Sequence, residues 1–361
     1  MSGPGAEAYF EIRNDLADGL LKGSHQLAGV PETDRATVLR AALDAVPEAS
    51  AMLRPYPALF ADGESSASRL AFSCLSAAAT FPRATRGRLA DLGALTTILF
   101  GVDDIADSIA GQWSEREVAA FFARFPAILS GTAEADPSEE PVGQVLAAWT
   151  QWCARFHTYE GAAVHSPNLA RQMEIAFTAM AHERAWTSGV EPWPSYDGYL
   201  ENGMLTILYH TWWVAALAMC GPFPAGAEHW TAIEPMTHLG ASSLRLANDI
   251  RSFEREKSEG KPNSVSILQA SGVGAAAAVR QVAAHIDEIN AAFRSEVAQV
   301  GGELAEIAEG QLRSVSFNGR WYMARDTHAY TVQELADEAG LVVPGQPGSE
   351  GDQPSGLVDR G

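Results

Sequence analysis

Apolar residues recur at helical spacing along almost the whole of this chain. Side chains three or four residues apart share one face of a helix, so the pattern predicts a helix wherever it persists. It is clearest over residues 41–53, 68–81, 87–110, 172–186 and 277–300. Proline and glycine gather between these segments, and no stretch alternates apolar and polar residues for long enough to form a sheet. The sequence therefore predicts an all-α fold.

The most apolar run of the chain extends from Met204 to Gly221. It contains His210 and ends at a Gly-Pro pair, so a buried helix explains it better than a membrane span does. We therefore expect no contact with a membrane.

The chain of 361 residues, 47% of them hydrophobic, is long enough for one large domain or for two ordinary ones. An acidic, proline-containing loop at Ser130–Gly143 lies between predicted helices and does not separate regions of different composition. We expect one helical domain at residues 31–341, preceded by an N-terminal segment at residues 1–30. Residues 342–361 lack the apolar residues needed to fold and are predicted to be a disordered tail.

The charge balance is strongly acidic, with 25 basic against 45 acidic side chains and a net charge of −20. A nucleic-acid-binding domain needs a basic face, so this class of partner is excluded. A diphosphate ligand would need metal ions or a local group of arginines. The three cysteines are scattered and the N-terminus lacks the pattern of a signal peptide, so we expect a cytoplasmic protein.

One polar motif stands out in the stretch ANDIRSFEREKSEG. Asn248, Ser252 and Glu256 are spaced four residues apart. Each step of four turns a helix by about 40° beyond a full circle, so the three side chains share one face. All three present oxygen, the ligand atom that Mg²⁺ prefers. By itself the motif is equally compatible with a solvated helix face.

A second oxygen-rich motif lies in the stretch LFGVDDIADS. Asp103 and Asp107 are one helical turn apart, and Asp104 lies beside them. Like charges this close destabilise a helix unless a cation or a basic group lies between them. A solvated helix end is the alternative, but two such motifs, each following an apolar helix, together predict a site that binds several Mg²⁺ ions across a diphosphate.

These motifs resemble those of class I terpene synthases, which carry an aspartate-rich motif and an N-S-E motif on opposite sides of a cavity. The stretches RLANDIRSFEREKSEGKPNSVS and AHERAWTSGVEPWPSYDGYLENG are similar to the class I domain of kaurene-synthase-like diterpene cyclases. The resemblance covers roughly residues 70–330. It implies a single-domain helical bundle around a central active-site cavity, three Mg²⁺ ions, and a prenyl diphosphate substrate.

The same resemblance indicates which basic residues grip the diphosphate. Arg245 lies three residues before Asn248 and Arg255 seven after it, and Arg325 precedes Tyr330 near the end of the domain. Arginine suits this role because its planar fork donates two parallel hydrogen bonds. The alternative for Arg245 and Arg255 is an ordinary ion pair with a glutamate of the same helix. The sequence departs from many bacterial relatives at Gly203 and Met204, where an arginine is common.

A carbocation needs a dry, apolar pocket whose aromatic faces stabilise the charge. The candidates for this wall, each with plain core packing as the alternative, are Phe100, Tyr209, Trp212, Trp213, Trp321 and Tyr322. His210 is a candidate base, with a core histidine as the alternative.

The interpretation we favour is a Mg²⁺-dependent diterpene cyclase that ionises a C20 diphosphate of the bicyclic copalyl type. The chain has no D-x-D-D motif, so a separate class II cyclase would have to supply that substrate. Direct cyclisation of linear geranylgeranyl or farnesyl diphosphate is the main alternative. A chain-elongating prenyltransferase fits less well because it carries two aspartate-rich motifs, and a non-catalytic helical binding protein leaves the pairing of the motifs unexplained. The oligomeric state stays open, with a homodimer among the states that relatives adopt.

Overall fold

The computed structural model describes residues 27, 30, 32–57, 63–106, 112–136, 141–324 and 334–336. Every regular element in these ranges is helical, which confirms the predicted all-α fold. Four predicted features lie outside the described residues, namely the N-terminal segment except residues 27 and 30, Asp107, the Arg325–Tyr330 stretch and the C-terminal tail.

The helices follow one another in chain order with short connections. They are α2 (Glu32–Leu53), α3 (Gly63–Thr80), α4 (Arg86–Asp104), α5 (Glu115–Leu129), α6 (Val142–Phe156), α7 (Ala162–Thr187), α8 (Tyr196–Thr206), α9 (Tyr209–Cys220), α10 (Glu228–Glu259), α11 (Ser264–Ala270), α12 (Ala275–Gln299), the 3-10 turn η4 (Gly302–Leu304) and α13 (Ala305–Ala324).

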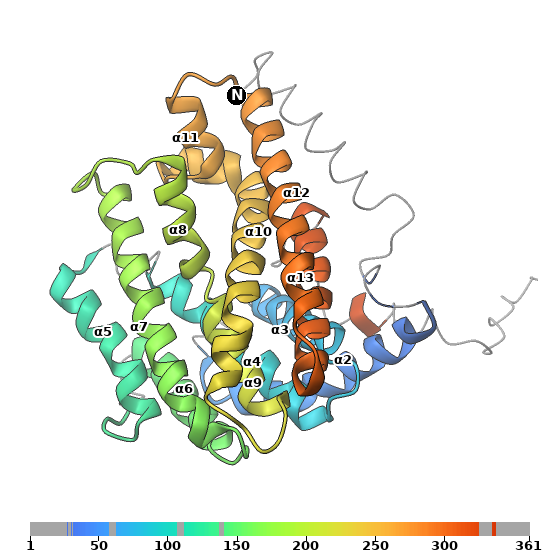
Figure 1. Ribbon diagram of the computed structural model, residues 1–361. Coiled ribbons are helices and arrows are strands. Elements are labelled where there is room, and N and C mark those ends of the chain that lie inside the picture. The colour runs from blue at the N-terminus through green and yellow to red at the C-terminus, as the bar shows by residue number, and fades with distance from the viewer. Residues whose placement is uncertain are drawn as a thin grey trace, which may run out of the picture.

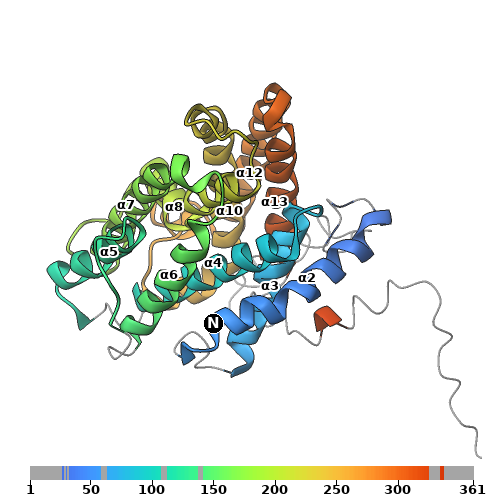
Figure 2. The ribbon, with the colours of Figure 1, turned by 90° about the horizontal axis from the view of Figure 1, so that it is seen from below.

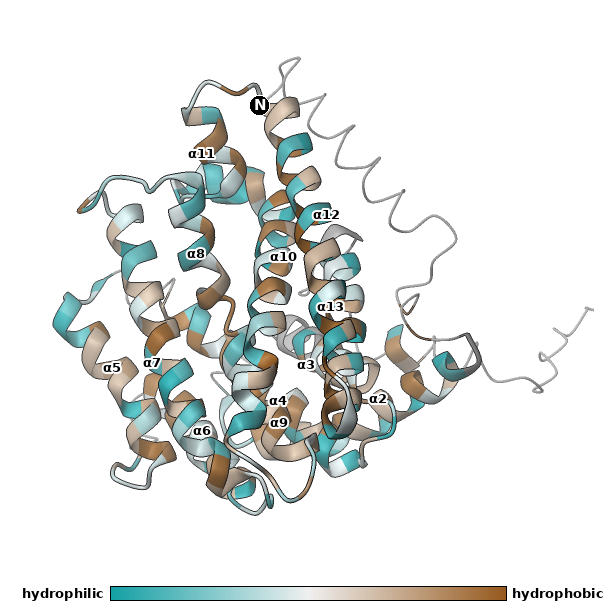
Figure 3. Ribbon diagram, in the orientation of Figure 1, coloured by the Kyte–Doolittle hydropathy of each residue, from teal (hydrophilic) through white to brown (hydrophobic). Residues whose placement is uncertain are grey.

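Five of these helices close a ring. Helix α3 packs on α4, α4 on α9, α9 on α10, α10 on α13, and α13 returns to α3. Helices α2, α6, α7, α8 and α12 each pack on one or more helices of this ring, and α5 packs on α6 and α7 (Figures 1 and 2). Figure 3 shows apolar residues along the inner faces of the bundle and polar residues toward solvent. Asp103 and Asp104 lie on α4 and the N-S-E motif lies on α10, which are both helices of the ring.

Local sequence fixes where several helices begin. Thr85 caps α4 by accepting a hydrogen bond from the backbone N–H of Arg88, and Ser114 forms a reciprocal capping box with Glu117 at the start of α5. Both side chains satisfy backbone N–H groups that have no partner within the helix. The cap at Thr85 starts the helix that ends, 19 residues later, in the aspartate-rich motif.

The apolar run Met204–Gly221 is not one helix. It spans the end of α8 and the whole of α9, and the chain breaks between them at Leu208, whose φ of 56° is left-handed. This conformation is unfavourable for a residue other than glycine. Tyr196–Cys220 is apolar and long enough to cross a membrane, but 78% of its most apolar part is buried inside the molecule. Burial in the protein core therefore accounts for its apolarity, as predicted.

Proline is less confined to connections than the sequence pattern predicted. Pro47, Pro126, Pro167 and Pro235 lie inside helices. Each lacks the N–H that would donate to the carbonyl four residues earlier, which disfavours proline inside a helix. Their positions show that tertiary packing outweighs this local preference in four helices of the described chain.

Candidate active site

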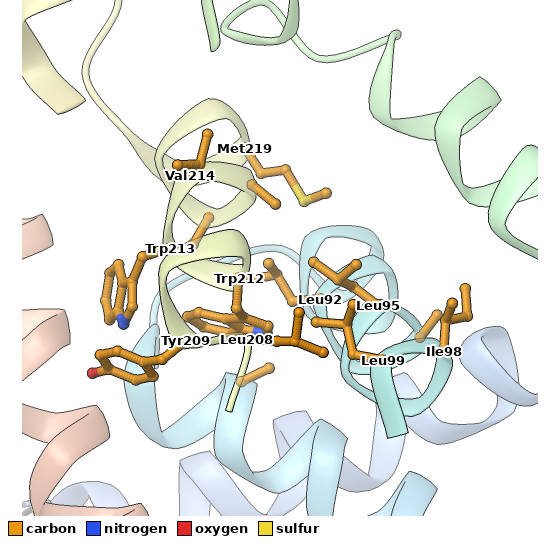
Figure 4. Packing of buried hydrophobic residues seen from close by; sticks show 14 of the residues in the cluster. Leu92, Leu95, Ile98, Leu99, Leu208, Tyr209, Trp212, Trp213, Val214 and Met219 are labelled. Atoms are coloured by element: carbon orange, nitrogen blue, oxygen red, sulfur yellow. The ribbon is translucent and has the colours of Figure 1, made fainter. Parts of the chain in front are cut away.

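Aromatic side chains fill one end of the ring. We call Phe81, Tyr209, Trp212 and Trp213 the aromatic floor. Trp212 stacks on Phe81 at 6.3 Å, and Trp213 meets Phe81 and Tyr209 edge-on at 5.7 and 6.0 Å. The indole N–H of Trp212 donates to Thr96 Oγ1 at 2.9 Å, which ties α9 to α4. Figure 4 shows Trp212 directed toward the leucines of α4, and Tyr209 and Trp213 on the other side of α9.

Two glycines let the floor approach its neighbours closely. A Cβ atom at Gly240 of α10 would lie 3.2 Å from the Tyr209 ring and 3.0 Å from Val315. A Cβ atom at Gly310 of α13 would lie 3.1 Å from the Phe81 ring and 3.3 Å from Trp213. The floor is therefore built from α9 and from Phe81, which directly follows α3, and it packs against α4, α10 and α13.

A second aromatic group lines the side of the ring formed by α3, α4 and α13. Phe72 lies 4.9 Å from Trp321, 6.2 Å from Phe100 and 6.2 Å from Phe317, measured between ring centroids. Trp321 is 1% exposed, and Phe100 is half-buried. Two of the six predicted wall residues, Phe100 and Trp321, thus belong to one aromatic group, and three others belong to the floor.

The two oxygen-rich motifs lie at the opposite end of the ring from the floor. Helices α10 and α13 run parallel, since Gly240 faces Val315 and, one turn later in both helices, Leu244 faces Gly319. One further turn brings Asn248 to the level of Tyr322. Burial, and then the negative charge of Asp103, raise the pKa of Tyr322 to about 12. On α4, Asp104 follows Thr96, which bonds the floor residue Trp212, by about 12 Å of helical rise. By helical rise, Asn248 lies about 12 Å along α10 from Gly240.

In the aspartate-rich motif, a basic residue that the sequence did not reveal neutralises one carboxylate. Arg69 of α3 forms two hydrogen bonds with Asp104, one of them from Nη2 to Oδ1 at 3.0 Å. The Arg69 guanidinium also lies 5.5 Å from the centroid of the Phe100 ring. Asp103 is exposed at the last turn of α4. The basic group beside the crowded carboxylates is thus an arginine of α3, which lies 35 residues before Asp104 in the chain.

The N-S-E motif occupies one face of α10, as its spacing predicts. Ser252 Oγ donates to the Asn248 carbonyl at 2.8 Å, which leaves the lone pairs of the hydroxyl oxygen as acceptors for a cation. Ser252 and Glu256 are 7% and 8% exposed, and Asn248 is half-buried. The donor set consists of neutral and anionic oxygen, so the residues fit a hard divalent cation such as Mg²⁺.

Arg245 lies one turn before Asn248 and is held by four protein groups. Its guanidinium donates to Tyr199 Oη at 3.0 Å and Thr206 Oγ1 at 3.1 Å, and it forms ion pairs with Glu183 at 3.2 Å and Asp249 at 3.0 Å. Burial opposes its charge, but the neighbouring carboxylates raise its pKa well above the usual value. Arg245 thus forms ion pairs with Asp249 and Glu183, and not the expected pair with a glutamate that follows it in sequence. Its role at the diphosphate stays a prediction.

Gly203 explains how Arg245 fits beside α8. A Cβ atom at this position would lie 3.0 Å from Arg245 Nε and 3.2 Å from its Cγ. At Gly203, near the place where many bacterial relatives carry an arginine, the Arg245 guanidinium therefore occupies the adjoining space. Arg255 is different, because its side chain is 61% exposed and pairs with Glu256 at 3.7 Å and Glu259 at 3.4 Å.

His210 faces away from the aromatic floor. Its ring lies 6.5 Å from Trp230 and 5.9 Å from the exposed His238, both on α10. Burial, and then the charge of His238, lower the pKa of His210 to about 4, so the ring is neutral at physiological pH. Its position agrees with the core-histidine alternative.

Three contributors to the site were not found from the sequence, namely Arg69, Tyr199 and Asn263. Arg69 and Tyr199 carry no local signal, since their partners lie 35 and 46 or more residues away. Asn263 lies within the stretch RLANDIRSFEREKSEGKPNSVS that carries the family resemblance. It is the N-cap of α11, and its side chain accepts from the backbone N–H of Val265.

A groove of about 810 Å³ lies elsewhere, between α5 and α7. The stacked rings of Phe122 and Phe177 and the side chain of Arg184 contribute to its lining. None of the predicted site residues lines it, so it is separate from the two motifs.

Comparison with known proteins gives the family. Residues 94–290 match the sequence model described as terpene synthase family 2, C-terminal metal binding. This range is more than half of the chain, and it contains both oxygen-rich motifs. The chain belongs to the terpene synthase family. The predicted resemblance to class I terpene synthases is thereby confirmed.

Sequence relatives of this terpene synthase include plant enzymes. It is 36% identical over 101 residues to S-linalool synthase from Clarkia breweri, which is 27% of this chain and 12% of that protein. It is 29% identical over 142 residues to an ent-cassa-12,15-diene synthase from Oryza sativa subsp. indica, which is 39% of this chain and 17% of that protein. The matched part is thus less than a fifth of either relative.

Solved structures share the fold of this terpene synthase. Linalool/nerolidol synthase from Streptomyces clavuligerus superposes with a TM-score of 0.61 at 18% identity, covering 77% of this chain and 96% of that one. Isoprene synthase from grey poplar, Populus x canescens, superposes with a TM-score of 0.62 at 16% identity, covering 89% of this chain and 60% of that one. These likenesses confirm the predicted helical fold.

Proposed function

We propose that this terpene synthase is a Mg²⁺-dependent diterpene cyclase that acts on a C20 prenyl diphosphate. The observation that carries the proposal is the common face of Asn248, Ser252 and Glu256 on α10, at the end of a ring whose opposite end is an aromatic floor. Asp103 and Asp107 are proposed to bind metal from the α4 side, and Asp104 would join them only if its ion pair with Arg69 opens. Bound Mg²⁺ would supply the Lewis acid that neutralises the departing diphosphate.

The residues of this chain have three proposed tasks in that reaction. The polar end of the ring binds the diphosphate and orients it. The apolar walls exclude water, which would quench a carbocation. The aromatic floor and the group around Phe72 present ring faces, whose quadrupoles stabilise positive charge. Because Trp212 is held by Thr96, its indole ring cannot turn freely.

A bicyclic copalyl-type diphosphate is the substrate that we propose, supplied by a separate class II cyclase. The local similarity to ent-cassa-12,15-diene synthase and to an ent-beyerene synthase of Oryza sativa subsp. japonica, 31% identical over 113 residues, supports this choice. The second candidate is direct action on a linear prenyl diphosphate. It is supported by the similarity to S-linalool synthase and by the fold shared with a Streptomyces clavuligerus enzyme that was solved with 2-fluorogeranyl diphosphate.

Product analysis by gas chromatography–mass spectrometry tests the proposal. The protein with Mg²⁺ is offered farnesyl, geranylgeranyl, copalyl and ent-copalyl diphosphates in parallel. A C20 hydrocarbon or alcohol formed only from a bicyclic diphosphate is the expected result. Cyclic product from a linear diphosphate would establish the second candidate instead.

Two substitutions in α10 test the proposed metal ligands. Glu256→Ala is expected to abolish turnover and to leave the helical circular dichroism spectrum unchanged. Glu254→Ala is the matched control, since it removes the same group from the same helix about 200° around the axis. Full activity of Glu256→Ala would refute the metal-binding role of Glu256.

A further inference from the structure

Asn263 lies directly beside the proposed metal ligand Glu256 and is fully buried. Its Nδ2 donates to Glu256 Oε2 at 2.8 Å and to the backbone carbonyl of Asp249 at 2.9 Å. Its Oδ1 accepts from the backbone N–H of Val265 at 2.9 Å. Both amide hydrogens and the amide oxygen are therefore used, and the side chain has one orientation.

The hydrogen bond from Asn263 makes the two oxygens of the Glu256 carboxylate unequal. Oε2 is held by a neutral donor, whereas the described contact of Oε1 is a long one, 3.7 Å from Arg255 Nη2. An amide fixes the carboxylate without cancelling its charge, unlike the guanidinium that takes both oxygens of Asp104. Oε1 thus keeps its capacity to bind a cation.

The backbone around Asn263 adds to the restraint on Glu256. The carbonyl of Glu256 accepts from the backbone N–H of Lys261 at 2.9 Å, and Gly260 makes the turn with a left-handed φ of 71°. The backbone N–H of Ser264 donates to Asp249 Oδ2 at 3.1 Å. The start of α11 is thereby anchored to α10 at the level of the motif.

We propose that Asn263 is a positioning residue for metal binding: it holds Glu256 so that Oε1 faces the divalent cation that accompanies a diphosphate. The inference rests on the proposed function, because it takes Glu256 as a metal ligand. Partners that orient a ligating carboxylate typically contribute 10- to 100-fold in metal affinity. Loss of the Asn263 amide is expected to weaken Mg²⁺ binding by about that factor.

The alternative is that Asn263 only caps α11. Asn263→Ser separates the two roles, because a serine hydroxyl still caps a helix but is too short to reach Glu256. Asn263→Asp is the second variant, for use if the serine variant does not fold. It keeps the shape and the capping oxygen and replaces the donating nitrogen by oxygen.

Gln311 offers a matched control at a distance. It is also a fully buried amide, and it donates to Thr237 Oγ1 on the same helix α10. Thr237 precedes Glu256 by 19 residues, which is about 28 Å along the helix. Gln311→Ala therefore removes a comparable buried hydrogen bond far from the motif.

The experiment measures how much Mg²⁺ stabilises the full chain against heat at a fixed concentration of inorganic pyrophosphate. The readout is the Mg²⁺ concentration above which the unfolding midpoint begins to rise, which tracks the dissociation constant, so a general loss of stability does not mimic the effect. Asn263→Ser is expected to raise this concentration about 10- to 100-fold. Gln311→Ala is expected to lower the midpoint and leave the concentration unchanged.

Glu256→Ala, measured in the same way, separates failure of this inference from failure of the proposed function. If Glu256→Ala weakens the Mg²⁺ response and Asn263→Ser does not, the role of Asn263 is refuted and the metal site stands. If Glu256→Ala has no effect either, both are refuted. An equal shift for Gln311→Ala would also overturn the inference, since the effect would then be unspecific.

Discussion

The replacement of Arg245 by methionine tests what the buried guanidinium contributes. Arg245 lies between the carboxylates of Glu183 and Asp249, and its side chain is 11% exposed. Methionine fills a similar volume and carries no charge. Burial already raises the pKa of Asp249 to about 6, although Arg245 lowers it, so removal of Arg245 is expected to raise that pKa further.

The cost follows from the burial of the two partners. Removal of one partner of a buried ion pair costs about 3–5 kcal/mol, because the other charge stays behind unpaired. Asp249 is fully buried, but Glu183 is 24% exposed and is partly solvated, so we expect about 3–4 kcal/mol. For a domain of about 300 residues, this corresponds to a fall of roughly 5–6 °C in the unfolding midpoint.

Differential scanning calorimetry at pH 7 measures this fall, and the double variant Arg245→Met/Asp249→Asn supplies the control. Asparagine removes the stranded charge and can still accept from Tyr199, so at least half of the lost stability is expected to return. A midpoint for Arg245→Met within 1 °C of the parent would refute the reasoning. So would a double variant that is no more stable than Arg245→Met.

The same double variant separates stability from ligand binding. If Arg245 also grips the diphosphate, the restored protein is expected to lose its stabilisation by Mg²⁺ and inorganic pyrophosphate. If it keeps that response, the role of Arg245 is confined to joining α10 with α7 and α8.

Three further predictions concern the rest of the fold. Burial, and then the charge of His229, lower the pKa of His165 to about 4. The unfolded chain therefore binds more protons than the native one between about pH 6.5 and 4, and the free energy of unfolding falls as the pH is lowered through this window. His165→Leu should remove up to about 1.4 kcal/mol per pH unit of this fall, as measured by urea unfolding curves. Gly161→Ala should cost more than about 2 kcal/mol in the same assay, because its Cβ would lie 2.5 Å from the backbone oxygen of Ala218, and a loss under 0.5 kcal/mol would contradict that contact. Trp212→Phe gives up the bond to Thr96 and part of the ring volume, so it should cost about 1–2 kcal/mol, and an unchanged urea midpoint would show that the aromatic floor can repack freely.

Much of the site could be predicted because its signals are local. The spacing of Asn248, Ser252 and Glu256 places them on one face of whatever helix forms, and α10 does form there. The crowding of Asp103 and Asp107, with Asp104 beside them, also predicted that a cation or a basic group would lie there. That this group is Arg69 could not be predicted, since the pairing of α3 with α4 determines it.

The same limit explains where the sequence pattern was incomplete. The run Met204–Gly221 is apolar throughout, so its composition does not mark the break at Leu208. The break follows from packing, because α8 lies against α10 and α11 whereas α9 turns toward α4. Likewise, nothing near Arg245 in the sequence pointed to Glu183, which lies 62 residues earlier on α7.

The sequence by itself determined the helical class, the two oxygen-rich faces and the family of this terpene synthase, because helical periodicity and short motifs are properties of neighbouring residues. Only the tertiary structure decided which charges are neutralised and which stay available. Arg69 takes both oxygens of Asp104, Arg245 is held by two carboxylates, and Asn263 holds a single oxygen of Glu256. The physical reason is that the partner of a buried charge is chosen by helix packing across the ring, and contacts between helices join residues that are far apart in the chain.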